Sequence, residues 1–144
     1  MITVKLINLE ELLPLRANIL RHGKKPKEVI FPGDENQDTF HVGSFLYGEL
    51  ITIGSFYNES YPYETGYGYR LRSMASVPIH RGKGGGRLLL DFGINKLTSM
   101  NVLYLWCNAR ENAVGFYEKM GLKKITTVFE IPGVGRHFVM KIQF

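Results

Sequence analysis

The chain has 144 residues, of which 44% are hydrophobic and 22% are charged, and its formal net charge is +5. This length suits one domain with one core, and the composition excludes a disordered chain. The single cysteine, Cys107, excludes an internal disulfide framework and a multi-cysteine zinc site, and the four scattered histidines form no metal-binding pattern. No apolar run approaches the ~20 residues that span a membrane, and the N-terminus lacks the apolar segment of a signal peptide, so we expect a cytoplasmic protein with no membrane partner.

The N-terminal residues predict a short strand followed by a helix. Thr3–Ile7 alternates as expected for a strand. Asn8 is followed three residues later by Glu11, which is the capping-box pattern that begins a helix. Pro14 predicts a kink or a later start of this helix, and Gly23 predicts its end.

A hairpin and a long strand are expected after a loop at residues 24–38, which is marked by proline and glycine. The hairpin strands are Phe40–Tyr47 and Leu50–Tyr57, on either side of a turn at Gly48-Glu49. A tyrosine-rich connection leads to the fourth strand, Tyr67–Val77.

The second half of the chain predicts two helices and three strands. The helices are Leu88–Met100 and Ala113–Met120, and the strands are Leu103–Cys107, Lys124–Glu130 and His137–Gln143. The element order is therefore β-α-β-β-β-α-β-α-β-β. The strand–helix–strand unit over residues 67–107 should have parallel, adjacent strands, and the rest of the sheet should be largely antiparallel.

A glycine-rich basic turn lies between the fourth strand and the helix that follows it. Glycines allow the backbone to turn sharply and to approach a ligand closely. The start of a helix leaves N–H groups unpaired at the positive end of its dipole. We therefore predict an anion site that suits a pyrophosphate. Its residues are Arg81, Gly82, Lys83, Gly84, Gly85, Gly86 and Arg87.

The spacing of this turn separates it from two common phosphate-binding loops. No Ser or Thr follows Lys83 as a P-loop requires, and Arg87 replaces the third glycine of the dinucleotide fingerprint. The pattern R-x-x-G-x-G, formed by Arg81, Gly84 and Gly86, resembles the acetyl-CoA pyrophosphate loop of the GNAT family of N-acetyltransferases. Considered alone, the loop leaves open the alternative of a flexible basic turn without a ligand.

A second segment, Asn108–Leu122, resembles the GNAT motif in which Y-E-K-x-G is flanked by Phe or Leu. The matching residues are Phe116, Tyr117, Glu118, Lys119, Gly121 and Leu122. The ending Gly133–Met140 is similar to the tail of small bacterial ElaA-like members. The resemblance implies a single α/β (α+β) GNAT domain over residues 1–144, with a mixed central sheet of about seven strands and helices on both faces.

The resemblance also implies roles for individual residues. Tyr117 matches the family tyrosine that faces the CoA sulfur, where a phenol with a pKa of ~10 can protonate a thiolate whose thiol pKa is ~8.5. A core aromatic residue is the alternative for Tyr117. Met74, Ala75 and Ser76 match the positions that hold the pantetheine by backbone pairing and provide an N–H for the thioester carbonyl.

The chain departs from the family pattern at three positions. Arg110 stands where many members have asparagine, and Asn112 is an imperfect substitute; Arg110 either reaches a CoA phosphate or is simply exposed. Leu105 and Arg70 stand where members place a glutamate base. The remaining proton acceptors are a water chain, Glu64, His41 and His137.

Two further features leave alternatives open. Arg70 and Arg72 share one strand face and would favour an acidic acceptor if that face lines the acceptor pocket; paired surface arginines are the alternative. Cys107 is either a covalent nucleophile or an inert buried thiol.

We interpret the sequence as an acetyl-CoA-dependent N-acetyltransferase that moves an acetyl group to a small-molecule or peptide amine by direct attack. The first helix, the loop at residues 24–38 and Tyr61–Tyr67 are expected to wall the acceptor site. The alternative is a non-catalytic acyl-CoA-binding or sensing module. The spread of the basic residues argues against nucleic acid as a partner. The acceptor and the oligomeric state stay open, with a homodimer as one option.

Overall fold

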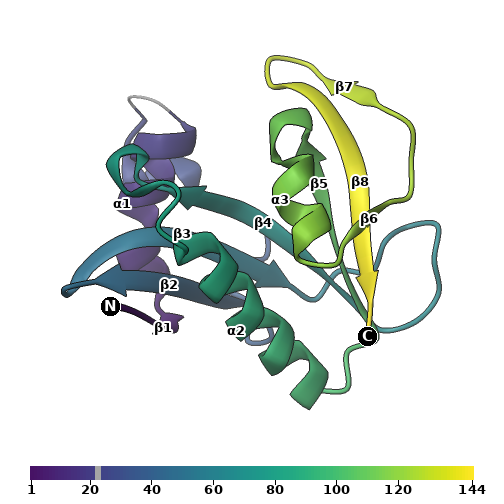
Figure 1. Ribbon diagram of the computed structural model, residues 1–144, viewed down its shortest axis with the longest axis horizontal. Helices are drawn as coiled ribbons and strands as arrows, with labels where there is room; N and C mark the ends of the chain where they lie inside the picture. Colours follow the sequence, from purple (N-terminus) through teal and green to yellow (C-terminus); the bar gives the residue numbers. More distant parts are fainter. Residues whose placement is uncertain (22–23) are drawn as a thin grey trace.

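The computed structural model describes residues 1–21 and 24–144. An eight-stranded sheet forms its framework, with strand order β1-β2-β3-β4-β5-β8-β6 and with β7 paired to β8 (Figure 1). The strands are β1 Ile2–Ile7, β2 Phe40–Leu46, β3 Glu49–Tyr57, β4 Gly68–Ser76, β5 Tyr104–Arg110, β6 Lys123–Lys124, β7 Phe129–Ile131 and β8 Gly135–Gln143. β4 and β5 are parallel, as predicted, and the six other pairings among the described residues are antiparallel.

In the described part of the chain, three α-helices cover the two faces of the sheet: α1 Leu9–Leu20, α2 Gly85–Ser99 and α3 Val114–Lys119 (Figure 1). Alternation along β3 separates the faces. Ile53 packs in the cluster that contains α1, whereas a Cβ on Gly54 would lie 2.9 Å from Leu89 of α2. α3 shares the α2 face, since Tyr117 belongs to the same cluster as Leu89. The predicted mixed sheet with helices on both faces is confirmed.

The start of α1 follows the predicted capping box. Asn8 Oδ1 accepts the Glu11 N–H at 2.8 Å, and Glu11 Oε1 accepts the Asn8 N–H at 3.2 Å. The helix then runs through Pro14, so the later start was wrong; Leu12 and Ala17 are buried against the sheet on either side of the proline and hold the helix in place. The end expected at Gly23 lies outside the described residues.

Several element boundaries differ from the sequence-based expectations. The hairpin turn is at Tyr47-Gly48, because both residues adopt the positive φ (49° and 81°) that a two-residue turn between twisted strands requires. α2 begins at Gly85 rather than Leu88. The expected strand Lys124–Glu130 is divided into β6 and β7, since Thr126 uses its side chain to accept the Val139 N–H at 3.0 Å.

The parallel pair separates soon after it begins. Only three residues of β4 are in register with β5, from Gly68 opposite Tyr104 to Arg70 opposite Trp106. Beyond that point both strands continue without a common ladder. β4 is irregular here, because Ser73 adopts φ 58° and the register with β3 shifts at this position. A bulge of this kind bends a strand and increases its twist, so it directs β4 away from β5.

None of the helices in the described part of the chain is long and apolar enough to cross a membrane.

Candidate active site

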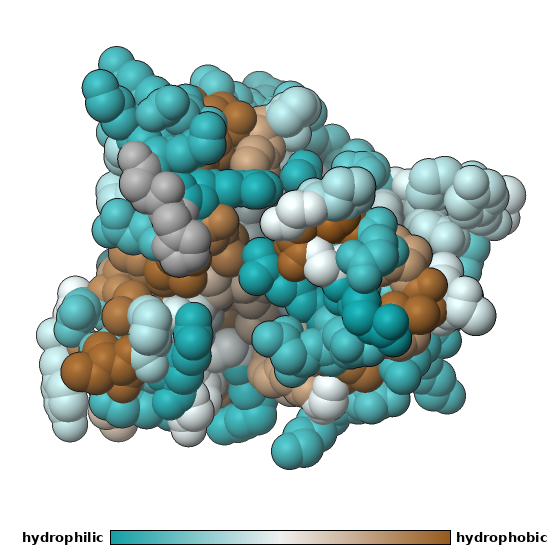
Figure 2. Space-filling model, turned by 90° about the horizontal axis from the view of Figure 1, so that it is seen from above, coloured by the Kyte–Doolittle hydropathy of each residue, from teal (hydrophilic) through white to brown (hydrophobic). Residues whose placement is uncertain are grey.

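A cleft of about 410 Å³ lies where β4 and β5 diverge. Figure 2 views this end of the molecule and shows a hollow with apolar surface inside it and hydrophilic side chains around it. The walls are residues 70–74 of β4 and 107–110 of β5, together with Leu20, Arg21, Phe31, Ala113, Tyr117, Ile131, Val134 and His137. Because the two strands no longer pair, their facing backbone edges are available to an extended ligand.

The bulge of β4 places an unusual residue in the cleft wall. Ser73 is in the left-handed region, and its buried Oγ has no hydrogen-bond partner among the described residues. Met74 lines the cleft beside it. Ala75 and Ser76, predicted with Met74 as pantetheine-binding residues, lie further along β4 in register with β3, and Ser76 Oγ is 2.9 Å from Thr52 Oγ1.

The glycine turn lies next to the cleft at the start of α2. Gly82 and Gly84 have φ values of 80° and 95°, which other residues rarely adopt. A Cβ on Gly85 would collide with Thr52, and one on Gly86 would lie 3.0 Å from Met74. The glycines therefore allow the first turn of α2 to pack directly against the sheet beside the cleft.

The charged residues of this turn point to solvent. Arg81, Lys83 and Arg87 are exposed. Lys83 Nζ lies 3.1 Å from His80 Nδ1, and Arg87 makes only a loose contact of 3.9 Å with Asp91. The first N–H groups of an α-helix have no acceptor inside the helix, so the turn combines free donors with free positive charge.

Tyr117 and Cys107 both line the cleft and belong to the same buried cluster. Burial raises the pKa of Tyr117 well above its ordinary value, with a further contribution from Cys107. Burial also raises the pKa of the Cys107 thiol to about 12. Tyr117 is therefore a protonated donor near neutral pH. Cys107 is a protonated thiol, which favours the inert alternative over the nucleophile.

Of the three side chains considered as proton acceptors, the cleft contains only His137 among its lining residues. Its Nδ1 lies 2.7 Å from the Gly135 carbonyl oxygen, and since a carbonyl can only accept, Nδ1 carries the proton. When the ring carries only this proton, Nε2 has none and can accept one. His41 is instead bound between Ser55 and the Asp34 carbonyl, and Glu64 pairs with Lys141 at 2.8 Å.

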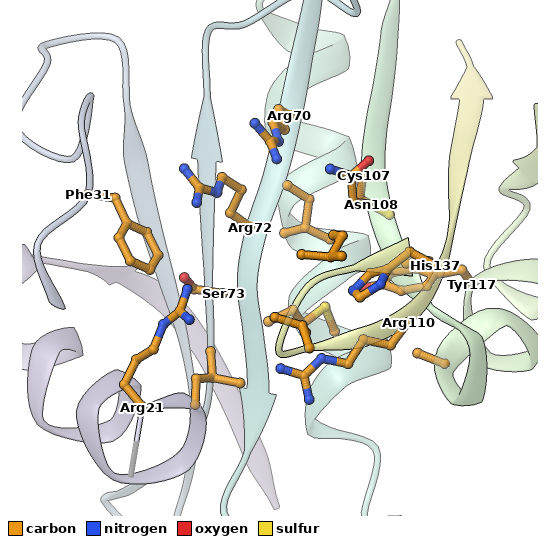
Figure 3. Close-up of a pocket in the computed structure, with 17 residues that line it drawn as sticks. Arg21, Phe31, Arg70, Arg72, Ser73, Cys107, Asn108, Arg110, Tyr117 and His137 are labelled. Atoms are coloured by element: carbon orange, nitrogen blue, oxygen red, sulfur yellow. The ribbon is translucent and has the colours of Figure 1, made fainter. Parts of the chain in front are cut away.

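Of the remaining predicted site residues, some line the cleft and others lie outside it. Arg110 reaches into the cleft from the β5 side (Figure 3), whereas Asn112 is exposed and outside it. The segment Tyr61–Tyr67, expected to wall the acceptor site, is not among the residues that line this cleft. Tyr61 packs on Trp106 with ring centroids 5.1 Å apart, at the end where β4 and β5 are still paired.

Comparison with known proteins places the chain in a family. Residues 31–144 match the model of the acetyltransferase (GNAT) domain. The chain belongs to the GNAT family of acetyltransferases. This GNAT protein is 38% identical over 141 residues to YitI of Bacillus subtilis, an uncharacterized N-acetyltransferase, covering 97% of this chain and 95% of the relative. The predicted family resemblance is confirmed.

Two solved structures share the GNAT fold of this chain. Escherichia coli ElaA matches with a TM-score of 0.77 and 19% identity, covering 98% of this chain and 99% of ElaA. An aminoglycoside 6'-N-acetyltransferase complexed with coenzyme A matches with a TM-score of 0.72 and 15% identity, covering 98% of this chain and 96% of the other.

The first helix and the loop at residues 24–38 were expected to wall the acceptor site, and Leu20 of α1 and Phe31 of that loop do line the cleft, together with Arg21, which directly follows α1. Two other features of the cleft were not predicted. The bulge at Ser73 left no signal, because serine is not a residue that indicates positive φ. The tautomer of His137 depends on a carbonyl two residues away, which the sequence alone does not orient.

Proposed function

We propose that this GNAT protein transfers an acetyl group from acetyl-CoA to an amine by direct attack of the amine on the thioester. The observation that carries the proposal is the arrangement of the cleft. It has the glycine turn beside it, an unpaired strand edge along its wall and a buried, protonated tyrosine within it. Acetyl-CoA would supply the activated acetyl group and the leaving thiol.

The glycine turn fits a pyrophosphate in shape and in charge. The first-turn N–H groups of Gly85, Gly86 and Arg87 have no acceptor within α2. A Cβ on Gly82 would meet nothing within 4 Å, so the outer side of the turn is open to a ligand. The exposed side chains of Arg81, Lys83 and Arg87 would add full charges to the helix dipole.

The edge of β4 would hold the arm of CoA and orient its thioester. Strand-like pairing of the pantetheine amides with the open edge near Met74 would extend the sheet by one ligand strand. A backbone N–H in the irregular segment at Ser73 and Met74 would then donate to the carbonyl oxygen as negative charge develops there. Ala75 and Ser76 stay predicted members of this set.

Two side chains would accept and donate the protons that move during acetyl transfer. His137 Nε2 would accept a proton from the attacking amine, directly or through a water molecule. Tyr117 would donate its phenolic proton to the sulfur as the carbon–sulfur bond breaks. After the transfer His137 carries the proton from the amine and Tyr117 is a phenolate. The cycle closes when His137 releases its proton to solvent and Tyr117 takes one up.

Calorimetry with acetyl-CoA tests the proposed ligand. We expect micromolar binding by the wild type and a loss of at least tenfold in the Arg81→Glu/Lys83→Glu variant, because two attractive charges become repulsive. Both side chains are exposed, so the fold should be retained. Lys123→Glu/Lys124→Glu on β6 is the control with the same change in net charge. Absence of binding by the wild type would refute the proposal.

The alternative is a non-catalytic acyl-CoA-binding module of the same fold. The absence of glutamate at both usual base positions, Arg70 and Leu105, motivates it. The protonated Tyr117 and the bare Nε2 of His137 in the same cleft favour the enzyme. Acetyl-CoA binding without thiol release for any amine in a panel of amino acids, peptides, polyamines and aminoglycosides would support the sensor.

A further inference from the structure

The cleft has two chemically different sides. Alternation along β4 and β5 directs Leu71 and Cys107 into the core beneath α2 and α3. Arg70 and Arg72 emerge on the opposite face. Arg70 lies 4.8 Å from the Trp106 ring centroid, and Arg72 lies against Phe31 in the loop after α1. The glycine turn begins α2, so the CoA side and the α1 side are separate. An acceptor would have to enter from the α1 side.

The α1 side carries an excess of positive charge. Four arginines line the cleft, and no aspartate or glutamate does so in the described part of the chain. The nearby carboxylates are already engaged: Glu59 lies 3.1 Å from Arg70, and Asp34 lies 2.6 Å from the fully buried Arg16. Within residues 1–21 and 24–144, no carboxylate lies within 4.0 Å of Arg21 or Arg72.

The guanidinium of Arg72 is positioned by two aromatic rings. Its guanidinium is half-buried, 4.5 Å from the Phe31 ring centroid and 5.9 Å from that of Tyr57. Burial lowers the pKa of Arg72, with Arg70 also contributing, so the charge is poorly compensated where it stands. Figure 3 shows Arg72 and Arg21 on either side of Phe31, facing the cleft. Arg21 lies 5.4 Å from the same ring.

A buried hydrogen-bond network around Asp34 holds the backbone of Phe31 in place. The Phe31 N–H donates to Asp34 Oδ2 at 2.6 Å, and Asp34 accepts two further hydrogen bonds from the buried Arg16 at 2.6 and 3.1 Å. Tyr57 also donates to Asp34. This buried network fixes the ring against which both cleft arginines lie. A guanidinium fixed in this way loses little freedom when it binds an anion.

We propose that Arg72 and Arg21 form an anion subsite that binds a carboxylate of the acceptor, so that the substrate is an amine with a carboxylate a few bonds away. Guanidinium groups bind carboxylates through paired, charge-assisted hydrogen bonds. Ser73 Oγ, buried without a partner among the described residues, would donate to the same group. The cleft volume of about 410 Å³ limits the acceptor to a small molecule or the end of a peptide.

The subsite rests on the proposed acetyl transfer, and matched acceptors test it. Thiol release is measured at saturating acetyl-CoA with glutamate against glutamine and aspartate against asparagine, which differ in the side-chain carboxylate. Glutamine against glutamine α-amide, which differ in the α-carboxylate, completes this arm. A second arm uses C-terminally amidated peptides that begin with glutamate or glutamine. We expect kcat/KM for the acid to exceed that for the amide by roughly tenfold or more in at least one arm. The arm that responds distinguishes a free amino acid from a peptide terminus.

Variants separate recognition from folding. Arg72→Gln and, independently, the exposed Arg21→Gln should raise KM for the acidic acceptor and bring the acid-to-amide ratio toward one, with calorimetric affinity for acetyl-CoA retained. Arg136→Gln, which removes an exposed arginine outside the cleft, should leave the ratio unchanged. Equal or better use of the amides or of a polyamine by the wild type would overturn the subsite and leave acetyl transfer standing. Failure to bind acetyl-CoA would overturn both.

Discussion

Tyr117 is the residue whose environment defines its chemistry most clearly. It is buried in the cleft wall in the same cluster as Cys107, and burial raises its pKa further above neutral. Tyr117→Phe removes only the hydroxyl and should lower kcat by ~10²-fold or more, because the leaving thiolate loses its proton donor. Acetyl-CoA affinity by calorimetry should be retained. Tyr63→Phe, at an exposed tyrosine, is the control; an unchanged turnover number in Tyr117→Phe would show that the hydroxyl has no part in the reaction.

His137 is tested by a variant that keeps its structural hydrogen bond. In His137→Asn the side-chain amide can still donate to the Gly135 carbonyl but cannot accept a proton. We expect kcat/KM to fall at least tenfold, because the variant lacks the side chain that accepts the amine proton, and the calorimetric affinity for acetyl-CoA to be retained. An unchanged kcat/KM would assign proton removal to water.

The start of α2 depends on close packing between elements. Gly85 lies against Thr52 of β3, and its carbonyl accepts the Ser44 hydroxyl of β2 at 2.8 Å. Gly85→Ala should therefore destabilise the protein by about 1–3 kcal/mol, although alanine is the better helix former. In α3, a Cβ on Gly115 would meet nothing within 4 Å, so Gly115→Ala should be neutral or stabilising by about 0.5–1 kcal/mol. Urea unfolding of both variants compares them directly, and equal effects would contradict the packing argument.

The loop after α1 depends on a buried ion pair. Burial alone would raise the pKa of Asp34, but hydrogen bonds from Arg16, Tyr57 and Phe31 outweigh burial and lower the pKa below its ordinary 3.8. A lowered folded-state pKa means that the carboxylate stabilises the fold above pH 3.8. This contribution is lost as the pH falls below 3.8 through the folded-state value.

Asp34→Asn should consequently lower the free energy of unfolding at pH 7 by about 3–5 kcal/mol, because Arg16 is left buried without its partner. The difference between wild type and variant should shrink as the pH is lowered past 3.8. Denaturant unfolding from pH 7 down to pH 3 measures this difference. Glu111→Gln, at an exposed pair with Arg136, should change stability by less than about 1 kcal/mol. A difference that does not vary with pH would refute the assigned role of Asp34.

At the scale of the whole molecule, two parts of the sheet meet at a short junction. The part from β1 to β4 carries α1 and α2, and the part from β5 to β8 carries α3 (Figure 1). Three residues of β4 in register with β5 join them. A ligand lying between β4 and β5 would complete the missing ladder and link the two parts.

Acetyl-CoA should therefore stabilise the whole protein against heat. At a concentration of 100 times Kd, ligand linkage contributes about 2.7 kcal/mol, which corresponds to a Tm increase of roughly 10 °C for a domain of this size. Differential scanning calorimetry over a series of acetyl-CoA concentrations measures the effect. The Arg81→Glu/Lys83→Glu variant is expected to show the same shift only at proportionally higher ligand concentration, and a ligand-independent Tm would argue against binding in the cleft.

Features that depend on neighbours a few residues apart could be predicted before the structure was known. The Asn8–Glu11 capping box and the glycine turn between strand and helix could be predicted from local hydrogen bonding and glycine spacing. The parallel pair flanking α2 could be predicted because a strand–helix–strand connection places its two strands parallel and adjacent. The two motifs that indicated the GNAT family are likewise continuous segments of the chain.

The formation of the cleft could not be predicted from local sequence patterns. The positive φ of Ser73 and the separation of β4 from β5 arise from the balance of packing across the whole sheet, which no local pattern encodes. The approach of Phe31 to Arg72 and the exclusion of Glu64 from the cleft depend on contacts between distant parts of the chain. The sequence specifies which side chains are present, but tertiary packing sets the distances between them.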